Sequence, residues 1–453
     1  MKLINQGEFD AYWKEFRPLS MDGEADRIAG EIISAVRREG DAAVRRYAAR
    51  FDRGLPETFE IPFARAEEAW AWLEKEDGAL SGALALAAGN IRRFALRQKA
   101  QFSDFEYECA PGILAGQKVI PVEKAAVYVP AGRFPLISSA LMGLVPALSA
   151  GTGEVILASP PLEDGLPDRR ILAAASAAAV VCRTADDVLP DDAACGAASG
   201  RLRIFALGGA QAIAALALGT ESVPRVDLIT GPGNKYVAAA KRLLSGEVGI
   251  DFVAGPTDVL VIADDSEAAD AKLIAADLLA QAEHDADARA RLLVPGRALA
   301  AKVMEELEKQ LASLAASAMV SLDRGGLIII YDTKEEALRI ANTIAPEHLE
   351  LQVKDSREWI PQLRNFGSLF IGKETAEVFG DYSAGINHTL PTSGGARYSG
   401  GLSVRHFLKT PTTLRASGDS EAVRRAAEII ARAEGLRGHE ASARMRAAEP
   451  REP

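Results

Sequence analysis

The spacing of apolar residues predicts an alternation of helices and strands along most of the chain. Between residues 24 and 52, apolar side chains recur at helical spacing with a polar opposite face, and Gly40 interrupts the pattern. This predicts two packed helices. A second helical stretch is predicted over residues 63–100, and it leads into segments rich in β-branched residues and bounded by Gly and Pro, which are typical of strands.

Four strand–turn–helix units then follow one another, beginning with the strands "AAVYVP", "EVILASP", "RLRIFAL" and "RVDLIT". Alternation of this kind predicts a parallel, doubly wound sheet. A second α/β series is predicted to open with "GIDFVAG" and "DVLVIAD". It continues with a helix over residues 267–284, the strands "RARLLV" and "GLIIIY", and further helices. The expected fold class is therefore α/β.

Composition and charge narrow the function classes. The chain has 453 residues, enough for about two to three domains. A formal net charge of −11 without a long Lys/Arg run argues against nucleic-acid or anionic-membrane binding, which need clustered positive charge. The apolar run 134–151 contains Pro135 and Pro146 and is interpreted as a buried helix. With no secretory signal, a cytoplasmic protein acting on a small molecule is expected.

The three cysteines have no metal-type or disulfide-type spacing, so candidate metal chemistry rests on other residues. Gln281 and His284 lie three residues apart on the predicted helix, and both side chains would project from one face towards a common ligand. Taken alone, a Gln-x-x-His pair at a helix end more often reflects capping or core packing than metal binding. Asp381 and His388 fall in a polar, glycine-rich stretch typical of ligand-binding loops, although turn stabilisation is the alternative.

Glu347 and His348 form the clearest candidate acid/base pair. Pro346 predicts a first helical turn, so the two residues are expected to open a short helix. A histidine that titrates near pH ~6.5 suits proton abstraction from an alcohol, and an adjacent carboxylate can activate water or stabilise the imidazolium. Helix capping by Glu347 beside a surface histidine remains the alternative.

Two glycine turns, "LGGAQ" at 207–211 and "GPGN" at 231–234, each follow an apolar strand and open a predicted helix. Such turns leave free N–H groups where a phosphate could bind. Neither is a complete GxGxxG fingerprint, so an unusual nucleotide site and purely structural turns both remain open.

Together these segments resemble the histidinol dehydrogenase family from about residue 24 to 446. The matching strings include "VYVPAGR", "GPGNKYV", "DLLAQAEHD", "APEHLEL", "GDYSAGINHTLPT" and "AEGLRGHEAS", in family order. The resemblance implies one zinc ion per subunit, with four residues at the family's metal positions: Gln281, His284, Asp381 and His439.

The resemblance also implies roles for other residues. His348 matches the general base and Glu347 the group that activates water, while the positions that contact NAD are matched by Tyr128, Gln211 and Asn234. Substrate contacts are implied for Thr257 and Glu434 as well as for the metal and acid/base residues. Glu434 and His439 would come from the partner subunit of a homodimer with shared active sites.

The implied activity is the zinc-dependent oxidation of L-histidinol to L-histidine through the aldehyde, the last step of histidine biosynthesis, with two NAD reduced. The implied architecture is two incomplete, Rossmann-like domains in an intertwined homodimer. We expect an N-terminal segment (1–25), a first domain (26–128 and 259–400) with the metal and catalytic residues, a second domain (129–258) on the NAD side, and a dimer-swapped C-terminal segment (401–453).

Some positions depart from the family pattern. Ala131 stands where a glycine is usual, and Thr257 and Asp258 replace a Ser-Glu pair. Segments such as "AGPTD" are closer to relatives that oxidise other small alcohols, including dihydroxypropanesulfonate, which is the alternative substrate. Glu434 favours histidinol. A zinc hydrolase on the same scaffold would lack NAD binding, and a non-enzymatic binding protein would leave the combination of motifs unexplained.

Overall fold

The computed structural model describes residues 1–16, 23–131, 135–183, 201–312 and 316–446. The chain divides into two compact units. The larger contains Met1–Leu96 and Val122–Phe407, and the smaller contains Arg97–Pro121 and Leu408–Pro453. No helix in these described ranges is both long and apolar enough to cross a membrane.

The first sheet of the larger unit has six strands in the order β10-β9-β6-β7-β8-β2. Five strands are parallel and β2 is antiparallel to its neighbour. The strands are β10 (Gly249–Ile250), β9 (Leu228–Thr230), β6 (Lys124–Tyr128), β7 (Glu154–Ser159), β8 (Leu202–Ala206) and β2 (Glu60–Ile61). The four predicted strand–helix units are confirmed. The segment "GIDFVAG" was wrongly assigned to the second series, because β10 pairs with β9.

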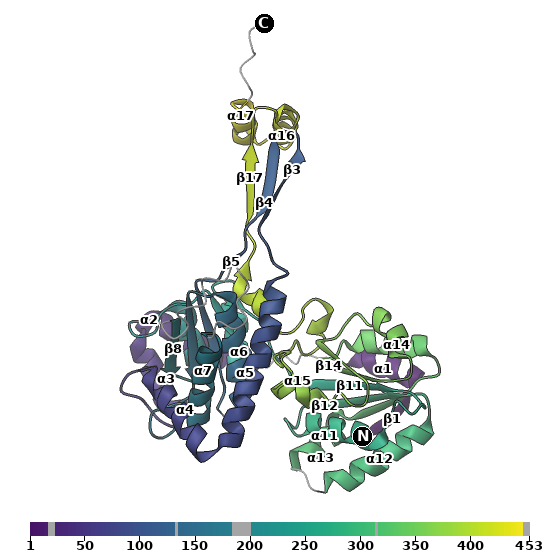
Figure 1. The fold of residues 1–453 in the computed structure, drawn as a ribbon. Helices are drawn as coiled ribbons and strands as arrows, with labels where there is room; N and C mark the ends of the chain where they lie inside the picture. The colour runs from purple at the N-terminus through teal and green to yellow at the C-terminus, as the bar shows by residue number, and fades with distance from the viewer. Residues whose placement is uncertain (17–22, 132–134, 184–200, 313–315, 447–453) are drawn as a thin grey trace. The chain divides into compact units, whose positions relative to one another are not determined.

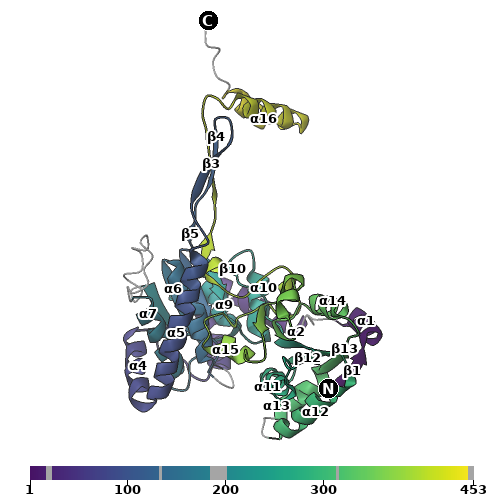
Figure 2. The same ribbon diagram turned by 45° about the vertical axis from the view of Figure 1, so that its right-hand side comes forward.

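Helices cover this sheet because the apolar side chains on one side of each helix are buried against the apolar strands. α2 (Gly23–Glu39), α3 (Asp41–Phe51), α9 (Gly209–Leu218) and α10 (Lys235–Leu244) share one buried core with residues of the sheet. α4 (Ala64–Glu76) and α6 (Ile137–Ala150) pack on α7 (Arg169–Val181), while α5 (Gly78–Lys99) follows α4 in the chain. α6 is almost entirely buried and contains Pro146, which confirms a buried helix in the apolar run. Figure 2 shows α6 beside α7.

The second sheet also has six strands, all parallel, in the order β1-β13-β12-β11-β14-β15. They are β1 (Lys2–Asn5), β13 (Leu327–Ile330), β12 (Arg289–Val294), β11 (Asp258–Ala263), β14 (His348–Gln352) and β15 (Ser368–Ile371). One core contains α1 (Gln6–Glu15) and α14 (Lys334–Ile344). Another contains α11 (Ala271–Ala282), α12 (Arg297–Leu311) and α13 (Ala316–Gly325) (Figure 1).

The segments that share a hydrophobic core differ from the domains that the sequence led us to expect. β1 pairs with β13, and Phe9 of α1 is buried in the second sheet's core, so residues 1–16 belong to that sheet. The apolar face of α2, including Ile32 and Val36, is buried with the first sheet instead. The buried apolar residues of α2 and α3 are therefore grouped with those of α9 and α10 and not with residues 259–400.

The smaller unit is built from two distant parts of the chain. β3 (Phe105–Ala110), β4 (Ile113–Gln117) and β17 (Thr412–Ala416) form an antiparallel sheet, and β5 (Ile120–Pro121) pairs with β16 (Leu408–Lys409). α16 (Glu421–Ala433) packs on α17 (Arg437–Arg444). The C-terminal segment thus begins this unit at Leu408 rather than 401, and the unit includes residues 97–121, which had been assigned to the first domain.

Candidate active site

The acid/base pair lies at the start of a strand, so the predicted short helix is wrong. α14 ends at Ile344, its C-cap Ala345 adopts the left-handed conformation (φ 52°), and the chain passes through Pro346 and Glu347 into β14. β14 is hydrogen-bonded on both sides, to β11 and β15, and this pairing overrides the local helical signal. Both Glu347 and His348 are buried, with 5% and 3% of their surface exposed.

Asp258, the first residue of β11, holds both members of the pair. Its Oδ1 accepts a hydrogen bond from the Glu347 backbone N–H at 2.9 Å, and its own N–H donates to Glu347 Oε2 at 3.1 Å. The Asp258 carbonyl oxygen lies 3.3 Å from His348 Nδ1. These contacts fix Glu347 from two sides and favour the tautomer of His348 that carries its proton on Nδ1.

A buried ion pair in turn fixes Asp258. Arg291 Nη1 donates to Asp258 Oδ2 at 2.6 Å, and both side chains are almost fully buried. The Arg291 guanidinium also lies over the rings of Trp13 and Phe16, 5.9 and 5.5 Å from their centroids. The N-terminal residues therefore contact the group that supports the acid/base pair.

Thr257 connects Glu347 to Gln281. The Thr257 hydroxyl donates to Glu347 Oε2 at 2.5 Å and accepts from Gln281 Nε2 at 2.5 Å. The Gln281 amide finds more partners when it is turned over: its oxygen then accepts from the Thr257 hydroxyl at 2.5 Å, in place of the bond from Nε2, and its nitrogen donates to the buried carboxylate of Glu377 at 3.1 Å. The hydroxyl retained at position 257 is therefore in direct contact with a candidate base and a candidate metal ligand.

Asp381 lies near Nε2 of His348, the ring nitrogen that has no well-formed hydrogen bond among the described residues. It lies on α15 (Glu377–Tyr382), and its Oδ1 is 3.4 Å from His348 Nε2, an ion-pair distance without a well-formed hydrogen bond. The Asp381 carbonyl oxygen is 2.8 Å from His388 Nδ1, and His388 Nε2 lies 3.1 Å from the hydroxyl of Ser139. The glycine-rich stretch therefore supplies two site residues, one of them from a short helix.

Electrostatics tune these groups in opposite directions. Burial raises the pKa of Glu347 to about 7 and that of Glu377 to about 8. Burial alone would lower the pKa of His348, but the charge of Glu347 and the nearby Asp381 and Glu377 hold it well above its usual value. Burial would raise the pKa of Asp381, yet its contact with His348 keeps it below the usual range.

Three buried carboxylates were missed by the sequence reasoning. Glu377 is fully buried, and its spacing of four from Asp381 on one helix was the available signal. Glu350 on β14 and Asp277 on α11 interact with each other, and burial raises the pKa of Asp277 to about 6 and that of Glu350 well above its usual value. A charged residue inside the apolar strand "HLELQ" was the signal for Glu350.

His284 differs from its expected position. α11 ends at Ala282, so His284 lies in the turn after the helix and is exposed, whereas Gln281 is fully buried on the last turn. Its charge still lowers the pKa of Asp381, although burial and other groups act on Asp381 more strongly. Glu434, the C-cap of α16, and His439 on α17 lie at exposed positions of the smaller unit.

One of the expected metal ligands, Gln281, is an amide, whereas the other three are histidine or aspartate side chains. Among the described residues, no three His, Cys, Asp or Glu side chains gather as a metal site. The set of Gln281, His284 and Asp381 supplies an amide oxygen, an imidazole nitrogen and a carboxylate oxygen, which are donors that zinc accepts. The residues of the larger unit therefore fit a zinc ion chemically.

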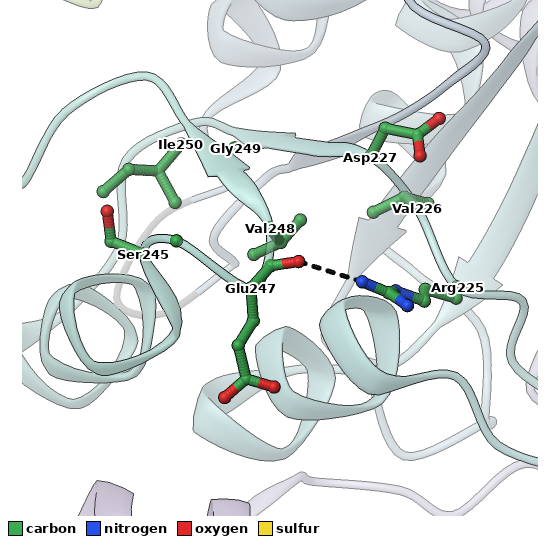
Figure 3. Close-up of a pocket in the computed structure, with 9 residues that line it drawn as sticks. Arg225, Val226, Asp227, Ser245, Glu247, Val248, Gly249 and Ile250 are labelled. Carbon is green, nitrogen blue, oxygen red and sulfur yellow. Dashed lines mark hydrogen bonds between the residues drawn. The ribbon is translucent and has the colours of Figure 1, made fainter. Parts of the chain in front are cut away.

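The expected NAD contacts surround the two glycine turns. The Tyr128 hydroxyl accepts from the Gly209 N–H at 3.1 Å, and Gln211 Nε2 lies 3.4 Å from Asp52 Oδ2. Asn234 caps α10, its side chain accepting from the N–H groups of Tyr236 and Val237. A separate pocket of about 380 Å³, formed by the residues that lead into β9 and by residues 245–250, is lined by Arg225, Asp227, Glu247 and Ile250 among others and contains none of the expected site residues (Figure 3).

Known proteins match nearly the full chain. The family model described as histidinol dehydrogenase matches residues 17–447. A histidinol dehydrogenase of Thermus thermophilus is 44% identical over 95% of this chain and 96% of its own length, and one of Methylococcus capsulatus is 42% identical over 96% and 93%.

A crystal structure of histidinol dehydrogenase from Elizabethkingia anophelis superposes with a TM-score of 0.84 at 31% identity, covering 96% of this chain and 95% of that one. The α/β fold with parallel sheets is thus shared over nearly the whole length. The resemblance inferred from the motifs is confirmed, and the chain belongs to the histidinol dehydrogenase family.

Proposed function

We propose that this enzyme oxidises L-histidinol to L-histidine in two NAD-linked steps. The observation that carries the proposal is the buried Glu347–His348 pair, whose orientation is fixed by Asp258 on one side while His348 Nε2 is left without a hydrogen-bond partner in the described structure. His348 has a ring nitrogen without a hydrogen-bond partner, close to the carboxylate of Asp381, and this arrangement suits the deprotonation of an alcohol.

His348 acts as the base for the alcohol. Its Nδ1–H is held by the Asp258 carbonyl, so Nε2 takes the hydroxyl proton while hydride leaves the carbinol carbon for NAD⁺. The carboxylates that raise the pKa of His348 stabilise the imidazolium that results. The first step thus yields an aldehyde, NADH and a proton held on His348.

Glu347 acts in the second oxidation. With a pKa near 7, its carboxylate changes protonation close to neutral pH and can remove a proton from the water that adds to the aldehyde. The hydrate then loses hydride to a second NAD⁺ and becomes the carboxylic acid. Thr257 holds the Glu347 carboxylate through its hydroxyl during this step.

One zinc ion per subunit is part of the proposal. Gln281, His284 and Asp381 would hold it, together with His439. Zinc supplies Lewis acidity that polarises the alcohol and carbonyl oxygens of the substrate. The mixed nitrogen and oxygen donor set supports zinc over a soft metal such as Cu(I).

A homodimer with shared active sites is also proposed, with Glu434 and His439 reaching the partner's substrate. The smaller unit supports this, because its sheet, α16 and the residue before α17 expose large apolar side chains: Tyr107, Leu414, Val423, Ile429, Ile430 and Leu436. Exposed apolar groups at this density are typical of a surface that another chain covers. A cytoplasmic location, where NAD and biosynthetic substrates meet, completes the proposal.

The test is the number of NADH molecules formed per substrate consumed by the zinc-loaded enzyme. Two NADH per L-histidinol, with L-histidine as product, are expected. Turnover of dihydroxypropanesulfonate without turnover of L-histidinol would instead assign the alternative substrate. No turnover of either compound would refute dehydrogenase activity. The His348→Asn variant should retain zinc and lose oxidation, so unchanged turnover would exclude His348 as the base.

A further inference from the structure

A buried ion pair contacts the candidate acid/base residues without being one of them. The Arg291 and Asp258 side chains are only 2% and 7% exposed, and Arg291 Nη1 donates to Asp258 Oδ2 at 2.6 Å. Removing two charges from water is costly, so a buried pair contributes little net stability over apolar side chains of similar volume. We therefore look for the role of this pair in the groups that it orients.

The second carboxylate oxygen of Asp258 holds the backbone of the acid/base pair. Oδ1 accepts from the Glu347 N–H at 2.9 Å, a group that precedes the pairing of β14, which begins at His348. The two oxygens thus serve two donors, one from Arg291 and one from the backbone. An amide has a single acceptor oxygen, so an asparagine here would turn its NH₂ group towards one of these donors. Both contacts together require a carboxylate at position 258.

Aromatic side chains of α1 cover the guanidinium group. The rings of Trp13 and Phe16 have their centroids 5.9 and 5.5 Å from the Arg291 guanidinium carbon, and the two rings stack on each other at 4.7 Å. Arg291 Nε has no hydrogen-bond partner among the described residues. A planar guanidinium can stack on a ring and still donate from its edge, whereas a lysine ammonium is a point charge without such a plane. The stacking therefore fixes the direction from which Arg291 donates to Asp258.

We propose that Arg291 and Asp258 are positioning residues that hold the Glu347 backbone and the His348 ring in the orientation that oxidation requires. The inference rests on the proposed function, because it takes Glu347 and His348 as the reacting groups. Asp258 contacts both, since its carbonyl oxygen also lies 3.3 Å from His348 Nδ1. Arg291 acts through Asp258. A displacement of about 1 Å at a reacting group can lower the rate about a hundredfold, so loosening this support slows the reaction.

The test compares the zinc-loaded wild-type enzyme with Arg291→Met, which removes the charge at similar length, and with the conservative Arg291→Lys. Hydrogen exchange at the Glu347 amide reports its contact with Asp258 and needs no turnover. In Arg291→Met we expect this amide to exchange at least about tenfold faster. We expect kcat with L-histidinol to fall by about ten- to a hundredfold, with KM changed less than about threefold. Arg291→Lys keeps the charge and should recover part of both losses.

Lys241→Met is the matched control for a general loss of stability. Lys241 and Asp251 form an ion pair that is equally buried, with side chains 3% and 0% exposed. Lys241 also donates to the Gly231 carbonyl oxygen at 3.0 Å, so its loss loosens the turn before α10 and not the entry to β14. Exchange at the Glu347 amide should stay as in the wild type. If Lys241→Met accelerated it as much as Arg291→Met does, the inference would be overturned.

The outcomes separate this inference from the proposed function. An active wild type with unchanged kcat in Arg291→Met, or with faster exchange at Glu347 and no fall in kcat, would refute the positioning role and leave the function intact. A wild type that does not oxidise L-histidinol would refute both. Should Arg291→Met not fold, Arg291→Gln removes the charge but keeps a neutral donor, and the absence of both changes in that variant would equally overturn the inference.

Discussion

Asp258 is the residue on which the acid/base pair depends most directly. Its carboxylate joins Arg291 to the Glu347 backbone, and its carbonyl oxygen faces His348. We expect Asp258→Asn to lower the free energy of unfolding by about 3 kcal/mol, because Arg291 is left buried without a counter-charge. Urea unfolding measures this loss.

The matched control is an exposed ion pair, that of Arg415 and Glu106, whose nitrogen and oxygen atoms are 2.6 Å apart. Glu106→Gln should change stability by less than about 1 kcal/mol, since solvent screens an exposed pair. Equal losses in the two variants would show that burial of the Arg291 pair contributes nothing.

Asp52 is a largely buried carboxylate, and its charge costs stability. Its pKa is raised from 3.8 to about 6, mainly by burial, so the folded state binds the proton more tightly than the unfolded state. The stabilisation from this proton is fully present below about pH 4 and is lost as the pH rises through 6. Asp52→Asn should therefore unfold at higher denaturant concentration at pH 7, by about 1–2 kcal/mol, and the gap should close by pH 4. A variant that is less stable at pH 7 would contradict this reasoning.

At this scale the sequence identified residue types better than their contacts. Glu347 and His348 could be selected because they are adjacent, and adjacency is visible in a sequence. Their support by Asp258 could not, because Asp258 and Glu347 are 89 residues apart and meet only through strand pairing. Glu350 and Glu377 were missed for a related reason, since burial of a carboxylate depends on what packs over it.

Elements were predicted well where the periodicity was long and poorly at their ends. The helix predicted over 267–284 ends at Ala282, and the helix predicted at Glu347 is the entry to β14. In the second case tertiary partners decide: β14 is paired on both sides, so a five-residue segment adopts the extended form despite the preceding proline.

The glycine turn before α10 requires glycine for two reasons. Gly231 has φ +109°, and a Cβ there would overlap the carbonyl oxygen of Tyr128. We expect Gly231→Ala to destabilise the protein by more than about 3 kcal/mol, from backbone strain and steric overlap together. Thermal unfolding with bound and unbound NAD⁺ measures the effect.

Gly246 separates the two causes. It has φ +100°, and a Cβ at this position would have no atom beyond its own chain neighbours within 4 Å. Gly246→Ala should cost only about 1 kcal/mol, the contribution of strain alone. Similar losses in both variants would mean that the approach to Tyr128 is not what restricts position 231.

At the scale of the whole molecule, the alternation of helix and strand patterns predicted two sheets of parallel strands. It did not predict which strands belong to each sheet. β1 comes from the first five residues and pairs with β13, more than 320 positions away in the chain, and residues 97–121 join the C-terminal segment in one small sheet. Patterns within a segment report its period and burial, whereas the partner that covers it is decided by the rest of the chain.

The proposed sharing of active sites can be tested by mixing two inactive variants. His348 lies in the larger unit and His439 in the smaller one. His348→Asn and His439→Asn should each abolish oxidation in the homodimer. If His439 serves the partner's site, a heterodimer of the two variants contains one intact site and one doubly damaged site. After unfolding and refolding together in equal amounts, about a quarter of the wild-type activity should return, since half the dimers are mixed and half their sites are intact.

If both histidines serve the same site from one chain, every site in the mixture lacks one of them, and no activity returns. A control mixture of His348→Asn with Glu347→Gln should stay inactive in either case, because these adjacent residues always belong to one chain and no combination rebuilds a complete pair. Recovery in the first mixture and not in the second would assign the exposed helices of the smaller unit to the partner's active site.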